Sequence, residues 1–592
     1  MLLASILNES AIIDEIAHIP AGVSYITLLD YRLNPEHPPL LKAISGAFVR
    51  IFVNPHFPTD IKSWKDDING QWNMGYSFLY GNGNNADNII FWGRIPVILL
   101  AIFLGWLLYN WVNKRFGYAT ALLTLAFFCF SPTMLAHSRY VTTDLGASFG
   151  FFIGITTFIH LLEQHTRRNA IIAGLMFGIA QLLKFSLVLL VPMCAALFLL
   201  WIVSMPVHGK KEWMHATGTL LKKIILMLLV ALAVVWIIYG LFTYNYPPER
   251  QLRDATTILS SYGFRPAVNL DLWLIRHSLT RPLGHYIMGV LMVQQRAAGG
   301  NTAYFLGEVD NKGSRLYFPL LYLVKEPLPL HIFSLISLFY MIAQFRSWRY
   351  RRKETPKQAA PWRETIHRYF VEWSCVAVIA IYWAISIKSP LNIGIRHVLP
   401  TFPFIYILVA RGITHWTRSY LIVCPQNWRQ ALRNVVAIFF TTLPRYIITG
   451  FLIFWLIIGT IAVSPSFLSF YNELAGGTSQ GWSIAVDSNY DWGQDLKRLA
   501  DFVKKNNIQK ISLDYFGGGV PQYYLGDRVE SWSSSRGQAK GWFAISATFR
   551  QGTFGTPVPG FNHNPADNYD WLKPYPPIAR IGYSIFVYKL PE

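Results

Sequence analysis

Charged residues are scarce in this sequence of 592 residues. Only 14% are Asp, Glu, Lys or Arg, whereas 53% are hydrophobic. A soluble globular protein carries about 25% charged residues, so this sequence has too little polar material to cover a soluble surface of its size. The composition therefore predicts a multi-pass membrane protein.

Cysteine is also scarce. The four cysteines lie in or beside apolar segments without paired spacing: Cys129, Cys194, Cys375 and Cys424. A zinc site or a disulfide framework requires cysteines at characteristic spacings. The sequence indicates neither, and it gives no sign of redox chemistry.

The motifs that bind nucleotides are missing as well. A run of three glycines, Gly517-Gly518-Gly519, follows a strand-like segment. It lacks the Lys-Ser/Thr of a P-loop and the spacing of a dinucleotide fingerprint, so we predict a turn. No internal repeat of fixed period is present.

The net charge of +20 raises the question of a nucleic-acid partner. Nucleic-acid binding requires basic residues gathered on a solvated face. Here Lys and Arg form short clusters between apolar runs, which is typical of membrane topology. We therefore expect membrane lipids and no nucleic acid among the partners.

The apolar segments predict about ten membrane helices. A core of ~30 Å needs about 20 helical residues at ~1.5 Å each, so the apolar tract 169–204 is too long for one crossing and should turn near Lys184. The other segments are 89–112, 119–135, 144–162, 223–243, 319–343, 372–387, 396–413 and 446–465.

Basic clusters test this segmentation, because cytoplasmic loops are rich in Lys and Arg. The clusters fall in alternate loops: Lys114-Arg115, Arg167-Arg168, Lys210-Lys211 with Lys222-Lys223, the run from Arg346 to Lys357, and Arg418 with Arg429 and Arg433. The opposite loops are then residues 8–88, 136–143, the turn at Lys184, 244–318, 388–395 and everything after 466. Asp14, Glu36, Asp144, Arg396 and the C-terminal region are therefore expected on one outer face.

Three parts follow from this pattern. Residues 1–88 are predicted to form an outer loop region with short helices, and residues 89–466 a transmembrane helical domain. Residues 485–592 alternate strand-like runs at 510–516, 541–547 and 578–588 with a helical stretch at 495–505. This alternation predicts a small extracytoplasmic α/β domain.

Acidic residues precede the first long apolar segments. Asp14, Glu15 and His18 lie within one turn if this segment is helical, although an exposed loop would also explain them. In Glu36-His37-Pro38-Pro39, the two prolines fix the preceding residues in an extended conformation. A plain helix N-terminus would also account for that sequence.

Asp144 ends the short outer turn Arg139-Tyr140-Val141-Thr142-Thr143-Asp144. It opens the next helix, so it could act only as an N-terminal cap. Three acids at the outer surface of the membrane, each next to a membrane segment, nevertheless favour a catalytic site.

Three cations are predicted at outer ends of apolar helices: Lys184, Lys325 and Arg396. Each could simply extend to the interface. However, cations are disfavoured on the outer side, and a lipid phosphate would give them an anionic partner. Acids beside such cations suggest transfer of a group from a lipid phosphate.

A set of ordered motifs resembles the bacterial glycosyltransferases that use phospholipid carriers. These enzymes have the GT-C fold and include the protein O-mannosyltransferases and the aminoarabinose transferase of lipid A, a group like glycosyltransferase family 39. The motifs are Asp14-Glu15, Glu36 to Leu40, His137 to Tyr140 with Thr143-Asp144, Arg396 to Pro400, and Ser488 to Leu496. The resemblance covers nearly the whole chain.

This resemblance implies an inverting transfer from a polyprenyl-phosphate sugar to an acceptor hydroxyl on a protein, lipid or glycan. Asp14 matches the loop aspartate of the family, which is the candidate general base, and such catalysis contributes ~10²- to 10⁴-fold. Glu15 would orient its neighbour or the acceptor, and Asp144 would contact the sugar or the acceptor. No nucleotide-binding domain is needed.

The resemblance also implies a set of donor-binding residues. Glu36 matches the acid of a Glu-Lys-Pro-Pro motif, where it lies near the phosphate and can bind a divalent metal; His37 replaces that Lys, so its phosphate contact needs a protonated ring or a metal. The full expected set for the donor phosphate and sugar is Glu36, His37, Arg139, Lys184, Lys325 and Arg396.

The family has a membrane helix before its Asp-Glu loop, whereas this sequence offers only Leu2 to Leu7. We therefore expect that the chain is truncated or that its start is misassigned. The expected location is the bacterial cytoplasmic membrane, with the site on the outer, periplasmic side. The alternatives are a flippase or transporter of lipid-linked sugars, which would carry ionisable residues deep within helices, and an envelope assembly protein, for which Asp14 would be dispensable.

Overall fold

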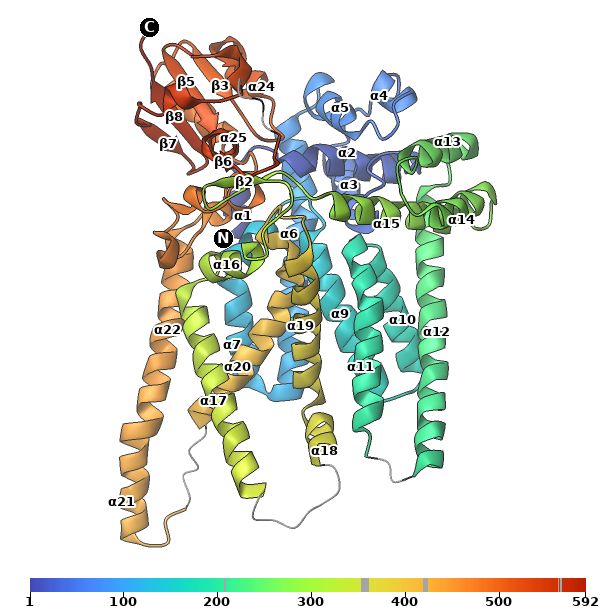
Figure 1. Cartoon of the computed structure of the whole chain (residues 1–592), viewed down its shortest axis with the longest axis vertical. Helices are drawn as coiled ribbons and strands as arrows, with labels where there is room; N and C mark the ends of the chain where they lie inside the picture. Colours follow the sequence, from blue (N-terminus) through green and yellow to red (C-terminus); the bar gives the residue numbers. More distant parts are fainter. Residues whose placement is uncertain (207–208, 353–360, 419–423, 563, 565–566) are drawn as a thin grey trace.

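The computed structural model describes residues 1–206, 209–352, 361–418, 424–562, 564 and 567–592. Long helices run side by side in one layer, and shorter helices and strands cover one end of that layer (Figure 1). The largest apolar core lies among the long helices, and a second core lies in the C-terminal region around Leu499, Leu513 and Val587.

The long helices satisfy the length and hydropathy of membrane spans. Six candidate spans occur in the described residues: α6 (Ala86–Phe116), α9 (Asp144–Glu163), the 3-10 turn η2 (Phe185–Leu189) with α11 (Leu190–Ser204), α12 (Lys210–Phe242), α19 (Phe370–Lys388), and α21 (Trp428–Ala437) with η5 (Ile438–Thr442) and α22 (Leu443–Ala462). A seventh is the pair α16 (Tyr317–Lys325) and α17 (Leu328–Arg352), bent by 109°. The chain is therefore a multi-pass membrane protein.

Six or seven helices of the described residues meet these criteria, compared with about ten predicted spans, and all ten predicted segments are helical. Three of them form helices shorter than the ~20 residues that a crossing needs: α7 (Tyr118–Cys129), α10 (Arg167–Gln181) and α20 (Phe402–Arg418). The tract 169–204 does form two helices that turn at Lys184, as predicted.

The basic clusters lie at the end of the bundle away from the C-terminal strands. The last turn of α6 carries Lys114 and Arg115, and α12 begins at Lys210. Both points lie at the lower end in Figure 1. The basic run from Arg346 to Lys357 extends into residues 353–360, which are outside the described residues. The two ends of the bundle thus differ in charge as the loop pattern predicts.

Short helices form much of the covering layer. Residues 1–88 form several of these short helices. The elements are α1 (Leu2–Ile6), α2 (Ile13–Leu28), α3 (Leu40–Phe52), α4 (Lys62–Lys65), α5 (Gln71–Tyr76), η1 (Ser77–Gly81), α8 (Pro132–His137), α13 (Pro248–Ile258), α14 (Arg265–Arg276) and α15 (Arg281–Gly299). Helices α2 and α3 cross at Gly22 and Gly46, where a Cβ on Gly22 would lie 2.0 Å from Lys42 O.

The C-terminal region contains a five-stranded mixed sheet in the order β4-β3-β5-β8-β7. Its strands are β3 (Ile511–Asp514), β4 (Val529–Ser531), β5 (Trp542–Ser546), β7 (Ala579–Ile581) and β8 (Ile585–Lys589), with helices α23 (Leu496–Lys505), α24 (Pro521–Leu525) and α25 (Ala547–Phe554). β3 pairs parallel to β4 and β5, whereas β8 is antiparallel to β5 and β7. This confirms the predicted fold class, mainly helical with a C-terminal α/β region.

Two details of this region differ from the prediction. The predicted strand 578–588 is a hairpin of β7 and β8, because Gly582 and Tyr583 turn the chain with positive φ. A second sheet joins β1 (Ala303–Phe305) and β2 (Glu308–Asp310) to β6 (Thr556–Pro557). Three-residue strands carry too little alternation to be recognised in a sequence.

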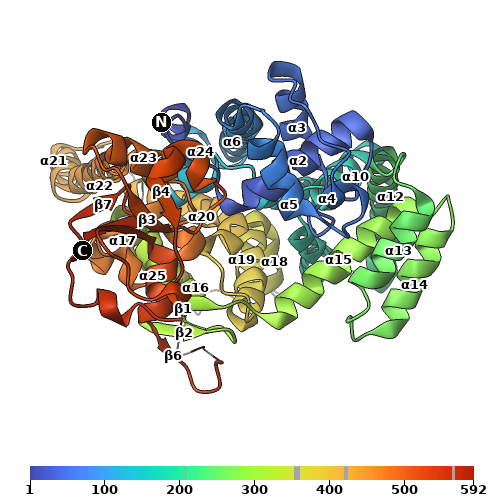
Figure 2. The same ribbon diagram turned by 90° about the horizontal axis from the view of Figure 1, so that it is seen from above.

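Short 3-10 turns connect these parts. They are η3 (Ile395–His397), η4 (Leu399–Thr401), η6 (Phe467–Ser469), η7 (Glu473–Ala475), η8 (Gly481–Ser483), η9 (Asp487–Asn489), η10 (Gly526–Arg528), η11 (Ser534–Arg536) and η12 (Asp570–Leu572), and α18 (Pro361–Arg368) precedes α19. Seen from above, the C-terminal strands lie over α17, α20 and α22, while α13 and α14 lie at the opposite edge, near α12 (Figure 2).

The glycine run docks the C-terminal region onto the N-terminal segment. Gly518 N donates to Ala11 O at 3.2 Å, and a Cβ on Gly518 would meet Ile12 O at 2.3 Å. Nearby, Ile13 N donates to Trp492 O at 3.3 Å. The run is a bend, as predicted, and it holds the segment immediately before Asp14.

Candidate active site

Asp14 lies in the first turn of α2, where a carboxylate is favoured by the helix dipole. Arg396 Nη1 donates to Asp14 Oδ2 at 3.0 Å and to Asp144 Oδ2 at 3.3 Å. Lys184 Nζ donates to the other oxygen of Asp144, Oδ1, at 2.5 Å. Four of the predicted site residues therefore form one cluster of two acids and two cations.

The two acids of this cluster differ in access. The Asp14 side chain is 22% exposed, whereas that of Asp144 is 1% exposed. Asp144 contacts both cations, so its carboxylate is fully engaged. Asp14 is consequently the more accessible of the two acids.

Arg396 is held in place by the motif that begins at Ser488. Its Nε donates to Ser488 Oγ at 3.1 Å, and its guanidinium carbon lies 4.3 Å from the centre of the Trp492 ring. Burial lowers the pKa of Arg396, but the carboxylates of Asp144 and Asp14 outweigh it and raise the pKa above its ordinary value. The guanidinium is thus a fixed positive charge.

The neighbouring Asn489 fixes the backbone that carries Arg396. Its Oδ1 accepts from Ile395 N at 2.9 Å, and its Nδ2 donates to Tyr317 OH at 2.9 Å. Ser488, Asn489 and Trp492 belong to a motif quoted for the family resemblance, but their positioning role could not be read from the sequence. It depends on contacts across about 90 residues of chain.

Two histidines pack beside the cluster. The rings of His18 and His37 lie 4.9 Å apart in a T-shaped contact, and His18 Nδ1 bonds to Val141 O at 2.8 Å. Burial lowers the pKa of His18 to about 4 and lowers that of His37 well below its ordinary value. Both rings are neutral at pH 7, so His37 does not supply the positive charge of the Lys that it replaces.

Both side-chain oxygens of Glu36 accept hydrogen bonds from amide groups. Its Oε1 accepts from Gln71 Nε2 at 2.5 Å, and its Oε2 accepts from Asn69 Nδ2 at 3.1 Å. Within the described part of the chain, no three His, Cys, Asp or Glu side chains form a group that could hold a metal ion.

Lys42 organises the turn that carries Glu36 and His37. It is 1% exposed, and its ammonium donates to Asn34 Oδ1 and His37 O, each at 2.7 Å. Sequence reasoning missed this residue. The available signal was a lysine inside the apolar helix that follows the two prolines.

Glu15 faces away from the acid cluster. Arg94 of α6 donates to its Oε1 at 2.8 Å and to its Oε2 at 2.7 Å. The same carboxylate accepts from Val141 N at 3.1 Å and from Ile12 N at 3.0 Å, and both charged side chains are fully buried. Glu15 therefore ties α2 to α6 and to the loop before Asp144.

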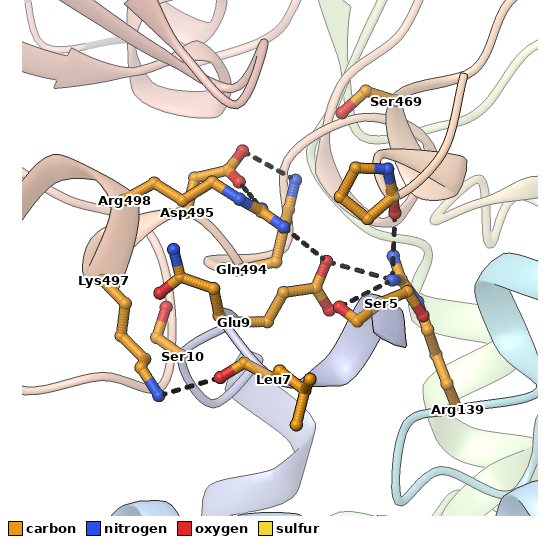
Figure 3. Close-up of polar contacts among 12 residues, drawn as sticks. Ser5, Leu7, Glu9, Ser10, Arg139, Ser469, Gln494, Asp495, Lys497 and Arg498 are labelled. Atoms are coloured by element: carbon orange, nitrogen blue, oxygen red, sulfur yellow. Dashed lines mark hydrogen bonds and ion pairs between the residues drawn. The ribbon is translucent and has the colours of Figure 1, made fainter. Parts of the chain in front are cut away.

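Arg139 is also buried in structural contacts (Figure 3). It pairs with Glu9 at 3.1 Å, and its Nη1 donates to Pro465 O at 3.1 Å. Glu9 in turn contacts Arg498 of α23 at 3.5 Å. The structure thus does not bring Arg139 to the cluster of Asp14, Asp144, Lys184 and Arg396.

The ammonium group of Lys325 likewise hydrogen-bonds to other groups of the protein. Its ammonium donates to Leu468 O at 2.7 Å and to Asn489 O at 2.6 Å, and it lies 4.5 Å from the centre of the Tyr471 ring. The side chain is buried. This arrangement braces the motif around Asn489 and leaves little access for a phosphate.

One known family model matches part of the chain. Residues 86–239 match the family model described as dolichyl-phosphate-mannose-protein mannosyltransferase. The match covers about a quarter of the chain, and over these residues it agrees with the predicted resemblance.

Two solved structures are similar to this chain at low sequence identity. ArnT from Cupriavidus metallidurans, solved bound to undecaprenyl phosphate, is 12% identical with a TM-score of 0.41, and the match covers 99% of this chain and 95% of that one. The Archaeoglobus fulgidus oligosaccharyltransferase, solved with zinc and sulfate, is 11% identical with a TM-score of 0.37, over 92% of this chain and 68% of that one. A comparison with curated protein sequences finds no significant match.

Proposed function

We propose that this protein is a membrane glycosyltransferase of the GT-C type, which moves a sugar from a polyprenyl-phosphate carrier to an acceptor hydroxyl with inversion at the anomeric carbon. One observation carries the proposal: Arg396 bridges Asp14 and Asp144 beside Lys184, where the membrane helices meet the covering layer. A base next to fixed cations suits removal of a hydroxyl proton and departure of a phosphate.

In the proposed reaction, Asp14 takes the proton of the acceptor hydroxyl. The hydroxyl oxygen attacks the anomeric carbon from the face opposite the phosphate. The bond between that carbon and the phosphate oxygen breaks, and its electron pair leaves with the lipid phosphate. Arg396 and Lys184 stabilise the negative charge that develops on the leaving group.

The charge balance of the cluster calls for one more cation. Asp14 and Asp144 already neutralise Arg396 and Lys184, so a phosphate would enter a site of zero net charge. Arg296, an exposed residue of α15, acts electrostatically on both His397 and Asp487 near Arg396. We assign Arg296 as a further phosphate contact, which the sequence did not suggest.

The remaining predicted residues take other parts in this proposal. Glu15, Arg139 and Lys325 position the backbone around the cluster and do not touch the substrate. Asp144 orients the two cations. His37, beside His18, and the neighbouring Glu36 offer hydrogen-bonding groups, where hydroxyls of the donor sugar would bind.

The proposed location is the bacterial cytoplasmic membrane, with the cluster and residues 485–592 on the outer side. The charge difference between the two ends of the bundle supports this orientation. The acceptor would be a protein, lipid or glycan that reaches the cluster from the covering layer.

A direct test uses membranes that contain the full chain and a panel of labelled polyprenyl-phosphate sugars. The proposal expects one donor to lose its sugar to a new product and to yield free lipid phosphate. The flippase alternative expects the labelled lipid to change leaflets with its sugar attached. That outcome, with no release of lipid phosphate from any donor, would refute the proposed function.

A further inference from the structure

A cavity of about 410 Å³ lies between the β1–β2 segment and the C-terminal α/β region. Its wall comes from three parts of the chain that are distant in sequence: the β1–β2 segment, the loop at Asn392 and Asp487, and the sheet region with Asp514 and Thr548. Ligand sites usually measure about 300–1,000 Å³. The cavity is therefore large enough for one or two sugar units.

The cavity adjoins the reacting centre through Asp487. The next residue, Ser488, accepts the bond from Arg396 Nε at 3.1 Å. Burial raises the pKa of Asp487 to about 6, Arg396 opposes this shift, and Asp14 adds to it. Asp487 therefore lies within electrostatic range of Arg396 and Asp14 and is also part of the cavity wall.

The backbone at Asp487 is also unusual. Its φ is +57°, a left-handed conformation that a residue with a side chain adopts at some cost. Asp487 N donates a hydrogen bond to Thr548 Oγ1 at 3.1 Å, and Ser488 N donates one to Asp487 Oδ1 at 2.5 Å. These contacts hold the Asp487 carboxylate in the wall of the cavity.

The chemistry of the wall selects a class of ligand. It contains two carboxylates, Asp487 and Asp514, and no Lys or Arg among its described lining residues. An anionic phosphate is disfavoured there, because nothing would neutralise it. Hydroxyl groups, of which Thr548 is one, and aromatic rings such as Phe549 complete the wall, and these groups suit the hydroxyls and apolar faces of a sugar.

We propose that this cavity binds the acceptor as a neutral, polyhydroxylated glycan and presents its hydroxyl to Asp14. The inference rests on the proposed function and adds the acceptor class to it. The donor phosphate then lies at Lys184, Arg396 and Arg296, and the acceptor reaches Asp14 past Asp487.

Two variants test the cavity without disturbing the cluster. Gly552 lies in α25 at the wall, and a Cβ there meets no atom within 4 Å, so Gly552→Phe fills the cavity without a clash at its first atom. Asp514→Asn keeps the shape but removes a charge; Tyr569 OH donates to Asp514 Oδ2 at 2.6 Å. Asp527→Asn, an exposed acid of the same region, is the control.

The measurement is saturation-transfer NMR on the full chain in nanodiscs, with maltose as the neutral probe and glucose 6-phosphate as the anionic probe. We expect transfer to maltose in wild type and in Asp527→Asn, loss of it in Gly552→Phe, and about tenfold weaker binding in Asp514→Asn. No signal from maltose in wild type, an unchanged maltose signal in Gly552→Phe, or a glucose 6-phosphate signal that Gly552→Phe abolishes would overturn the inference. Because the measurement needs no donor, it can fail or succeed independently of sugar transfer.

Discussion

Arg396 Nη1 lies 3.0 Å from Asp14 Oδ2, although 382 residues separate the two in the chain. The same nitrogen reaches Asp144 at 3.3 Å. One guanidinium group thereby connects the N-terminal helix α2, the start of α9 and the loop before α20.

Arg396→Lys should lower kcat/KM by about 10- to 100-fold. A lysine has one ammonium and lacks the planar fork that contacts Asp14, Asp144 and Ser488 together. The measurement is initial rate against donor concentration in membranes with matched protein levels. Arg276→Lys, an exposed arginine of α14, is the control, and equal kinetics in both variants would show that the fork is not needed.

Arg296→Gln should raise the KM for the donor about tenfold with little change in kcat. Its proposed contact is to the lipid phosphate in the bound substrate and in the transition state alike, so its loss weakens binding uniformly. Arg276→Gln serves as the matched control. A fall in kcat with unchanged KM would contradict the assigned role.

Glu15→Gln should mainly destabilise the fold. Removing one partner of a buried ion pair costs roughly 3–5 kcal/mol, because the other charge stays buried and unpaired. Thermal unfolding of the purified protein should show this loss, and the double variant Glu15→Gln, Arg94→Met should recover part of it. If Glu15→Gln keeps full stability and still loses all turnover, Glu15 is catalytic and its structural role is wrong.

Asp491 gives a prediction of pH dependence. It is fully buried, its Oδ1 has no hydrogen-bond partner among the described residues, and burial raises its pKa to about 7 from an ordinary value of 3.8. The folded state therefore holds a proton that the unfolded state releases, so stability falls as pH rises towards and through 7 and levels off above it. Between pH 6 and 8 the loss is about 1 kcal/mol.

The check is a comparison of thermal unfolding at pH 6 and pH 8. Asp491→Asn cannot titrate, so its melting temperature should fall less than that of wild type over this interval. Asp527→Asn, which changes an exposed acid, should behave as wild type. An identical pH response in Asp491→Asn and wild type would mean that Asp491 is already ionised in the folded protein.

The cluster itself was predictable because each member stands at the end of an apolar segment. Counting segments and basic loops placed Asp14, Asp144, Lys184 and Arg396 on one face, and the structure brings them into contact. The same reasoning predicted the turn at Lys184 and the C-terminal α/β region. The order of apolar segments and basic loops indicates at which end of a helix a residue lies.

The partners of buried charges were not predictable in this way. Glu15 and Arg139 belong to the quoted motifs, yet they pair with Arg94 and Glu9 rather than with the cluster. The direction in which a side chain points at the end of a helix depends on tertiary packing. A single sequence does not contain that information. The family motifs therefore mix residues proposed for chemistry with residues that hold the backbone in place.

The most direct test of the central claim is the turnover of the active donor by Asp14→Asn. Release of lipid phosphate is measured in membranes, against wild type and against Asp60→Asn, an exposed acid of the same N-terminal region. The account predicts that Asp14→Asn inserts normally and loses about 10²- to 10⁴-fold in rate, while Asp60→Asn keeps the rate of wild type. Equal rates for Asp14→Asn and wild type would contradict the claim that Asp14 is the base.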